Sequence, residues 1–259
     1  MELSKELIEK LEDKFDKRFQ FNQELSFNEA LKEYQSLKDF APDGNVSDVA
    51  DGISDEAHFI MRTITQHYIE QAFRAMKIDL TNPNVASDNE GNIGTPGRIA
   101  KVWCGFDTHD DTELGSGRWS QKPRLATFPN THLDKFPITK QVKLTSNCSH
   151  HFLPFSSVFR EDAKVVISYI PGKKVLGISK LQRLVDWVSS RFFLQEDLTR
   201  KIFEEIKDAA ETDDVFVGLY NIQHTCESLR GTKSIDGAFS SIYYDGEFKK
   251  TKVRNSILN

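Results

Sequence analysis

Residues 179–210 read "SKLQRLVDWVSSRFFLQEDLTRKIFEEIKDAA". Apolar side chains recur at spacings of three and four through this stretch, which predicts two consecutive helices over Ser179–Phe193 and Gln195–Ala210. Segments that alternate apolar and polar residues, as strands do, stand on both sides of the two helices. The order strand–strand–helix–helix–strand–strand predicts an α+β fold built on an antiparallel sheet.

The strand segments follow a helical first half of the chain. They are "ITKQVKLTS" at 138–146, "DAKVVISYI" at 162–170, "DVFVGLYNIQHTC" at 214–226 and "GAFSSIYYDG" at 237–246. Upstream, residues 1–40 carry apolar side chains at helical spacing, and residues 41–52 have the composition of a linker. A long helix is expected to begin at Ser54 and a short one at Thr95–Pro96, followed by a polar loop over 107–124.

The composition excludes several classes of protein. Hydrophobic residues make up 38% of the 259 residues and charged residues 28%, a balance that favours a soluble chain with a substantial core. The formal net charge of −5 gives no reason to expect nucleic acid or an anionic membrane as a partner. No signal peptide is visible, and no apolar run approaches the roughly 18 residues of a membrane helix. Three cysteines argue against a disulfide framework, so we expect a cytoplasmic protein.

Two short segments, "NCSHHFLPF" at 147–155 and "NIQHTCESLRG" at 221–231, pair cysteine with histidine. The spacing of Cys148 and His151 lets one tight turn aim both side chains at one point, and Cys226 can arrive from a distant strand. Two thiolates and one imidazole suit Zn²⁺, and three protein ligands leave a fourth position for water, as in catalytic zinc sites. Short Cys-x-x-His motifs also arise by coincidence, with the cysteine packed as a small apolar side chain. Cys104 matches no ligand position and is read as a packed thiol.

His150 and His224 flank the proposed ligands without being needed for coordination. Neutral imidazoles beside a metal-activated water are natural general acid–base groups near neutral pH. The alternative is that one of them only donates a hydrogen bond to a metal ligand.

Five segments, taken in order, resemble a known family. They are "TPGRIAK" from Thr95, "TSNCSHHFLPF" from Thr145, "GISKLQRLVDW" from Gly177, "LQEDLTRKI" from Leu194 and "HTCESLRG" from His224. Together they are similar to GTP cyclohydrolase I, over roughly Glu56 to Tyr244. The resemblance implies the tunnelling fold, an antiparallel sheet with two helices packed on one face, preceded by a helical N-terminal region. It divides the chain into an N-terminal arm and linker, 1–53, and a catalytic domain, 54–259, which is helical over 54–104 and has the tunnelling fold over about 136–245.

The resemblance also assigns roles to individual residues. The zinc ligands would be Cys148, His151 and Cys226, and the catalytic groups His150, His224 and Ser179. The guanine edge would be read by Gln195 and Glu196, and the triphosphate by Lys180, Arg183, Arg230 and Arg98 together with Ser179. A carboxylate suits guanine because the base presents two adjacent donors, although an acid here also complements the helix dipole. For each cation taken alone, a solvated surface charge is the ordinary alternative.

The implied reaction is zinc-dependent hydrolysis and rearrangement of GTP to 7,8-dihydroneopterin triphosphate with release of formate. Alternatives are a zinc-containing GTP- or pterin-binding module without turnover, and a different enzyme on the same fold. The product could feed folate, reduced biopterin or 7-deazaguanine synthesis. The family's assembly, a decamer with sites at subunit boundaries, implies a homo-oligomer. One departure stands out, because Ser149 occupies a position where the family usually has glutamate.

Overall fold

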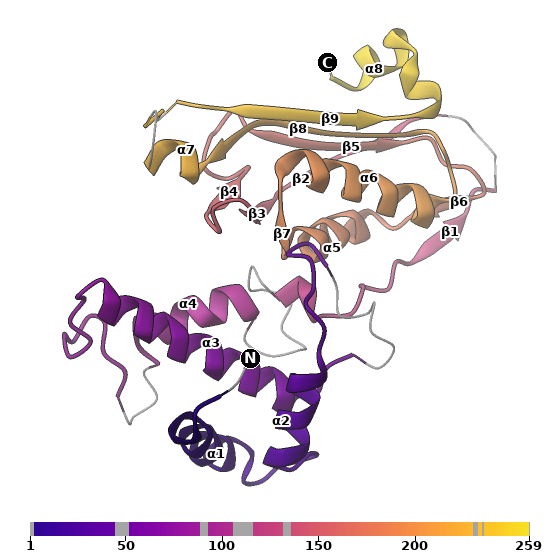
Figure 1. The fold of residues 1–259 in the computed structure, drawn as a ribbon. Coiled ribbons are helices and arrows are strands. Elements are labelled where there is room, and N and C mark those ends of the chain that lie inside the picture. The colour runs from indigo at the N-terminus through magenta and orange to yellow at the C-terminus, as the bar shows by residue number, and fades with distance from the viewer. Residues whose placement is uncertain are drawn as a thin grey trace. The chain divides into compact units, whose positions relative to one another are not determined.

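The computed structural model describes residues 3–44, 52–88, 93–105, 116–131, 136–229, 233–234 and 236–258. The chain forms two compact units, Met1–Gln121 and Lys122–Asn259 (Figure 1). No helix among the described residues is both long and apolar enough to cross a membrane.

The first unit is helical. It contains α1 (Lys5–Phe19), α2 (Phe27–Ser36), α3 (Asp55–Ala75), α4 (Gly94–Cys104) and the short η2 (Ser116–Arg118). Serine side chains accept a hydrogen bond from the first turn of α1, α2 and α3, at Ser4, Ser26 and Ser54, which explains why these helices begin where they do. The helix starts expected near Ser54 and Thr95 are confirmed to within one residue.

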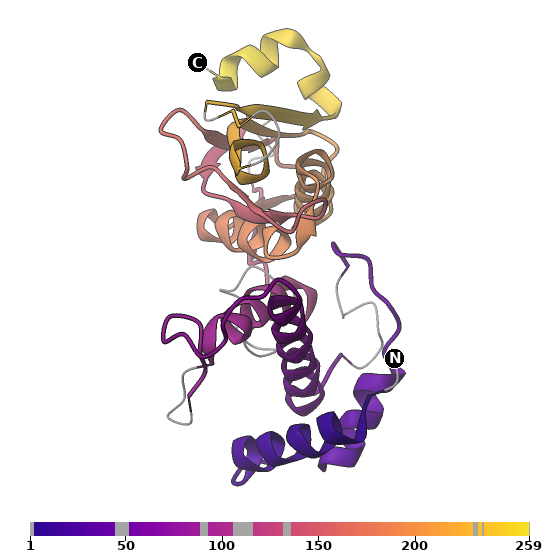
Figure 2. The same ribbon diagram turned by 60° about the vertical axis from the view of Figure 1, so that its left-hand side comes forward.

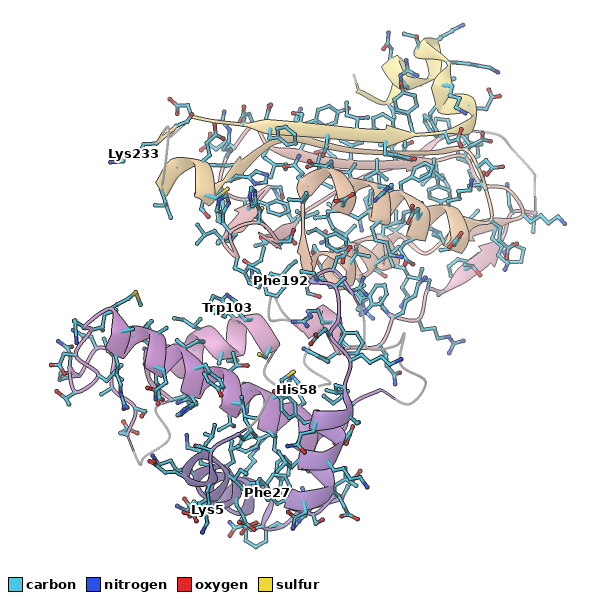
Figure 3. The ribbon with its side chains drawn as sticks, viewed as in Figure 1. Lys5, Phe27, His58, Trp103, Phe192 and Lys233 are labelled. Carbon is cyan, nitrogen blue, oxygen red and sulfur yellow. The ribbon has the colours of Figure 1, made fainter. Side chains whose placement is uncertain are left out.

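The apolar stripes of the N-terminal helices are buried within this unit. Leu7, Leu11 and Phe15 of α1 form one core with Phe27 of α2 and with α3. Phe15 and Phe27 meet edge to face, with ring centroids 5.5 Å apart. Figure 3 labels Phe27 among the side chains of this unit. The first 40 residues, predicted as an amphipathic arm, therefore share their core with the long helix α3.

The second unit contains the sheet. Its strands are β1 (Thr127–Pro129), β2 (Ile138–Val142), β3 (Thr145–Cys148), β4 (Pro154–Ser156), β5 (Lys164–Tyr169), β6 (Lys174–Leu176), β7 (Phe192–Phe193), β8 (Val215–His224) and β9 (Phe239–Tyr244). Seven strands form the main sheet in the order β2-β5-β8-β4-β3-β7, with β9 paired to β8. β1 and β6 form a separate pair.

Helices cover both faces of this sheet (Figures 1 and 2). The predicted pair, α5 (Ile178–Ser189) and α6 (Gln195–Ala210), packs on one face over a large core that includes Leu184, Ile202 and Val217. On the other face, η3 (Gly246–Lys249) and α8 (Thr251–Leu258) cover Val166 and Phe216.

Three details differ from the sequence-based expectation. Among the strand pairs described, β3 and β7 run parallel, so the sheet is not wholly antiparallel. Helix α5 ends at Ser189, whereas the prediction continued it to Phe193. Phe192 and Phe193 instead form strand β7, which pairs with Asn147 and Cys148. Cys226 lies in the short helix α7 (Thr225–Leu229), because β8 ends at His224. Each difference depends on contacts with segments distant in sequence.

An ion pair between a buried carboxylate and two partly exposed lysines ties α6 to the segment that opens this unit. Glu205 is buried and accepts hydrogen bonds from Lys122 and Lys201, the latter at 3.1 Å. Burial raises the pKa of the Glu205 carboxyl, but the two lysines outweigh burial and hold that pKa below the ordinary value of 4.5. A depressed carboxyl pKa means that the ionised pair stabilises the fold above the ordinary pKa and stops doing so as the pH falls.

Glu205→Gln should therefore lower the free energy of unfolding by about 1–3 kcal/mol at neutral pH. The deficit relative to wild type should shrink as the pH falls through and below 4.5. Thermal denaturation over this pH range measures both effects. The exposed neighbour Glu204 provides a matched control, since Glu204→Gln should change little at any pH. A Glu205→Gln deficit that stays constant with pH would contradict the assignment.

Candidate active site

The turn between β3 and β4 presents the Cys-x-x-His motif. The Cys148 N–H donates to the Leu153 carbonyl at 2.9 Å, and the Phe152 N–H donates to the Cys148 carbonyl at 2.8 Å. Phe152 takes a left-handed conformation with φ of 54°, which closes the turn. Within it, the His150 and His151 rings stack with centroids 4.3 Å apart. A tight turn therefore places the thiol and both imidazoles at one end of β3.

The second cysteine arrives beside this turn through strand pairing. His224, the last residue of β8, lies opposite Phe155 of β4. The Thr225 hydroxyl donates to the Pro154 carbonyl at 2.7 Å and fixes the start of α7, which carries Cys226. Burial raises the pKa of the Cys226 thiol, and the nearby Cys148 thiol raises it further. Because β4 pairs with both β3 and β8, the segments that carry the two thiols adjoin the same strand.

The donor chemistry of this site fits zinc, but the structure does not show a closed ligand set. Two thiols and an imidazole are suitable Zn²⁺ ligands. Over the described ranges, no group of three or more His, Cys, Asp or Glu side chains is arranged to hold a metal ion. β4 pairs with β3, which ends at Cys148, and with β8, which ends just before Cys226 in sequence, and the His151 ring lies against His150.

His224 is the most firmly held side chain of the site. Its ring stacks on Phe155 with centroids 4.5 Å apart and an interplanar angle of 6°. Its Nε2 lies 2.7 Å from Gln195 Oε1. Burial lowers the pKa of His224, and the carboxylates of Glu227 and Glu196 oppose this effect. These contacts hold a half-buried imidazole at the end of β8.

Gln195 and Glu196, the two residues expected to read guanine, have different surroundings. Gln195 is buried, and its Nε2 donates to the Phe239 carbonyl at 3.2 Å and to Ser241 Oγ at 2.9 Å. Its carbonyl end contacts His224, so both ends of the amide are engaged within the chain. Glu196 is exposed and acts electrostatically on His224. The link from Gln195 to His224 was missed from sequence, because no local pattern connects residues so far apart.

The expected phosphate-binding residues fall into three groups. Ser179, Lys180 and Arg183 lie on the first two turns of α5, with Ser179 and Arg183 exposed. The first turn of α5 has no side-chain cap, so its amides are suited to an anion. Arg98 is exposed on α4, in the first unit. Arg230 lies outside the described residues.

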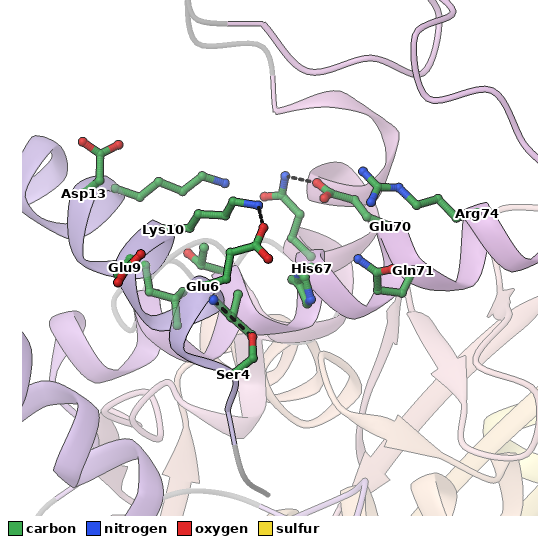
Figure 4. Close-up of a pocket in the computed structure, with 14 residues that line it drawn as sticks. Ser4, Glu6, Glu9, Lys10, Asp13, His67, Glu70, Gln71 and Arg74 are labelled. Carbon is green, nitrogen blue, oxygen red and sulfur yellow. Dashed lines mark hydrogen bonds and ion pairs between the residues drawn. The ribbon is translucent and has the colours of Figure 1, made fainter.

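The pocket drawn in Figure 4 does not contain these residues. It is a cavity of about 650 Å³ between α1 and α3, lined by charged and polar side chains such as Glu6, Lys10, His67 and Glu70. Glu6 and Lys10 form an ion pair across one turn of α1 at 2.6 Å. The residues that line this pocket thus belong to the first unit, and none of them is a predicted site residue.

The fold and the site define an α+β protein in which β4 adjoins both the turn that carries the Cys-x-x-His motif and the strand end that carries His224. A sequence model of the family described as GTP cyclohydrolase I matches residues 69–259. GTP cyclohydrolase 1 of Blochmanniella pennsylvanica (strain BPEN) is 32% identical over 203 residues, which cover 77% of this chain and 84% of that protein. GTP cyclohydrolase 1 of Flavobacterium johnsoniae is 27% identical over 192 residues, covering 74% and 77%. The chain belongs to the GTP cyclohydrolase I family.

Among solved structures, the apo form of the archaeosine synthase QueF-Like covers 41% of this chain and 90% of its own, with 20% identity and a TM-score of 0.33. That score is too low to carry an argument about fold or function.

Proposed function

We propose that this protein is a zinc-dependent GTP cyclohydrolase I that converts GTP to 7,8-dihydroneopterin triphosphate and formate, at an early step of pterin or folate synthesis. Family membership supports the reaction class. The observation that carries the proposal is the convergence of the β3–β4 turn, the end of β8 and the start of α6. It sets His224 beside Gln195, and the segments that carry Cys148 and Cys226 both adjoin β4.

Zinc would be held by Cys148, His151 and Cys226. When bound there, it would supply Lewis-acid activation of a water molecule. The chain's own contribution is to place imidazoles beside that position. His224 is fixed by Phe155 and Gln195, and His150 stands on the turn itself, so both can move protons to and from the purine and ribose. Ser179 is a further candidate for proton transfer in the later steps.

The N-terminus of α6 would bind the guanine base, and the N-terminus of α5 would bind the triphosphate. Glu196, exposed on the first turn of α6, would accept hydrogen bonds from guanine N1–H and its 2-amino group. Ser179, Lys180 and Arg183 on α5 would bind the triphosphate, helped by the helix amides and joined by Arg98 and Arg230. Gln195 would act on the base only if its present bonds to Phe239, Ser241 and His224 rearranged.

A second candidate is a GTP- or pterin-binding module without turnover. This alternative is raised by Ser149, which stands where the resemblance implies glutamate. We expect turnover to survive this departure, because it removes no expected ligand, base-reading carboxylate or phosphate contact. Incubation with GTP labelled at C8 separates the two possibilities. Labelled formate and a fluorescent pterin after oxidation support the enzyme. GTP binding without formate, from protein loaded with zinc, would favour the module.

We also propose a homo-oligomer, a decamer by analogy with the family, in which neighbouring subunits share each site. Arg98→Ala and Glu196→Ala should each be strongly impaired alone. If Arg98 contributes to the site of a neighbouring subunit, some sites in a mixed oligomer combine a wild-type Arg98 from one subunit with a wild-type Glu196 from the other. Dissociating, mixing and reassembling the two variants should then restore part of the activity. Failure to recover activity from verified mixed oligomers, or a fully active monomer by light scattering, would contradict shared sites.

A further inference from the structure

Strand β8 changes the face it presents to the helices partway along its length. Val217 and Leu219 belong to the core beneath α5 and α6, whereas Phe216 packs in the separate cluster on the opposite face. Odd-numbered residues thus face the helices in the first part of β8. After residue 221 the pattern is reversed, because Ile222 joins the helix-side core and His224 contacts Gln195 of α6.

The neighbouring strand β9 does not change face. Phe239 contacts the His224 ring, Ser241 accepts from Gln195, and Tyr243 packs against Phe203 of α6. These residues follow one another at intervals of two, as expected for an undisturbed strand. The change of face therefore arises within β8.

The pairing of the two strands locates the cause. Leu219 lies opposite Ser241 and Ile222 lies opposite Phe239, so β8 places two residues where β9 places only Ser240. The extra residue is a β-bulge, which moves every later side chain of β8 to the other face. Without it, Gln223 would face α6 and His224 would face away.

Asn221 has the features of the residue that holds this bulge. Its φ of 54° lies in the left-handed region, which asparagine tolerates better than other residues except glycine. Its N–H donates to the Ser240 hydroxyl at 3.0 Å, opposite the bulge. Its Nδ2 donates to the Asp162 carboxylate at 3.2 Å, and Arg160 holds that carboxylate with bonds of 2.9 and 3.0 Å.

We propose that Asn221 is a positioning residue for the cyclohydrolase reaction, because the bulge it maintains turns His224 toward Gln195 and the substrate. This inference rests on the proposed function. Among the described residues, the hydrogen bonds of Asn221 go to Ser240 and Asp162, which are neither expected ligands nor residues assigned to substrate. Its loss should therefore lower kcat while the substrate-binding residues of those helices stay in place.

Asn221→Val tests the proposal, because a β-branched residue strongly disfavours a positive φ. We expect kcat per bound zinc to fall by about 100-fold, the usual contribution of a general acid–base group, with KM for GTP within about threefold. Asn221→Gly lacks the side chain but adopts a positive φ readily, so its kcat should be close to that of wild type. A crystal structure of Asn221→Val should show Gln223, rather than His224, facing Gln195. If the valine variant fails to fold, Asn221→Ala applies a milder form of the same strain.

Glu211→Val is the matched control. Glu211 has a φ of 51° at the C-terminus of α6 and is exposed, so valine there imposes a similar backbone strain away from the site. Its kcat should stay within about threefold of wild type. Equal losses of kcat in the Glu211 and Asn221 variants, or a full kcat in Asn221→Val, would overturn the proposal. If wild type releases no formate, the proposed function fails, while the crystal structure still tests whether Asn221 sets the face of His224.

Discussion

Cys226→Ala should purify without stoichiometric zinc and should release formate from GTP at least about 100-fold more slowly than wild type. Even residues that only support a metal ligand typically contribute 10- to 100-fold in affinity or activity, so loss of a direct thiolate ligand should cost at least as much. Cys226 is the proposed ligand whose position depends on the end of β8, because the Thr225 hydroxyl bonds the Pro154 carbonyl at the start of α7. Elemental analysis of the purified variant measures zinc independently of turnover.

Cys104→Ala is the matched control for this experiment. Cys104 is a buried thiol at the end of α4, near the Thr65 hydroxyl, and belongs to the first unit. It matches no ligand position, so its removal should leave the zinc content unchanged. Equal zinc in Cys226→Ala and wild type would show that this thiol is not a ligand and that the proposed site is wrong.

Glu196→Ala should lose recognition of guanine while it keeps its metal. A carboxylate that accepts from two adjacent donors of the base makes charge-assisted hydrogen bonds, and losing them should cost about 2–4 kcal/mol. This cost corresponds to an affinity for GTP weaker by about 30- to 1000-fold. Titration calorimetry with a non-hydrolysable GTP analogue measures it directly. Zinc analysis of the same preparation shows whether the metal site is intact.

Two comparisons make this test specific. Inosine triphosphate lacks the 2-amino group, so wild type should bind it more weakly than GTP, and Glu196→Ala should no longer distinguish the two. Asp197→Ala removes the adjacent carboxylate, which pairs with Arg200 at 2.7 Å, and should leave GTP affinity nearly unchanged. A Glu196→Ala variant that binds GTP with wild-type affinity would mean that another residue reads the base.

The sequence alone predicted those helices and strands that form through interactions between residues close together in the chain. The helices α3 and α6 were predicted to within about a turn, because helical periodicity is decided within a few residues, as is the Ser54 cap of α3. The same holds for β5, which lies within the strand predicted at 162–170. The residue types at the site, two thiols and neighbouring imidazoles, were likewise visible in two short motifs.

Tertiary structure decided how those residues face one another. β8 was predicted as one alternating strand through Cys226, but alternation alone would put His224 on the face opposite Leu219. The bulge at Asn221 reverses that outcome. In this bulge, two residues of β8 lie opposite Ser240 of β9. The Asp162 carboxylate, from a distant segment, accepts a hydrogen bond from the Asn221 side chain. Likewise Gln195, which the resemblance assigns to the guanine edge, bonds from the start of α6 to Ser241 of β9 and His224 of β8. Strand register depends on pairing between distant segments, so the identities of the site residues could be predicted from sequence, whereas their orientation could not.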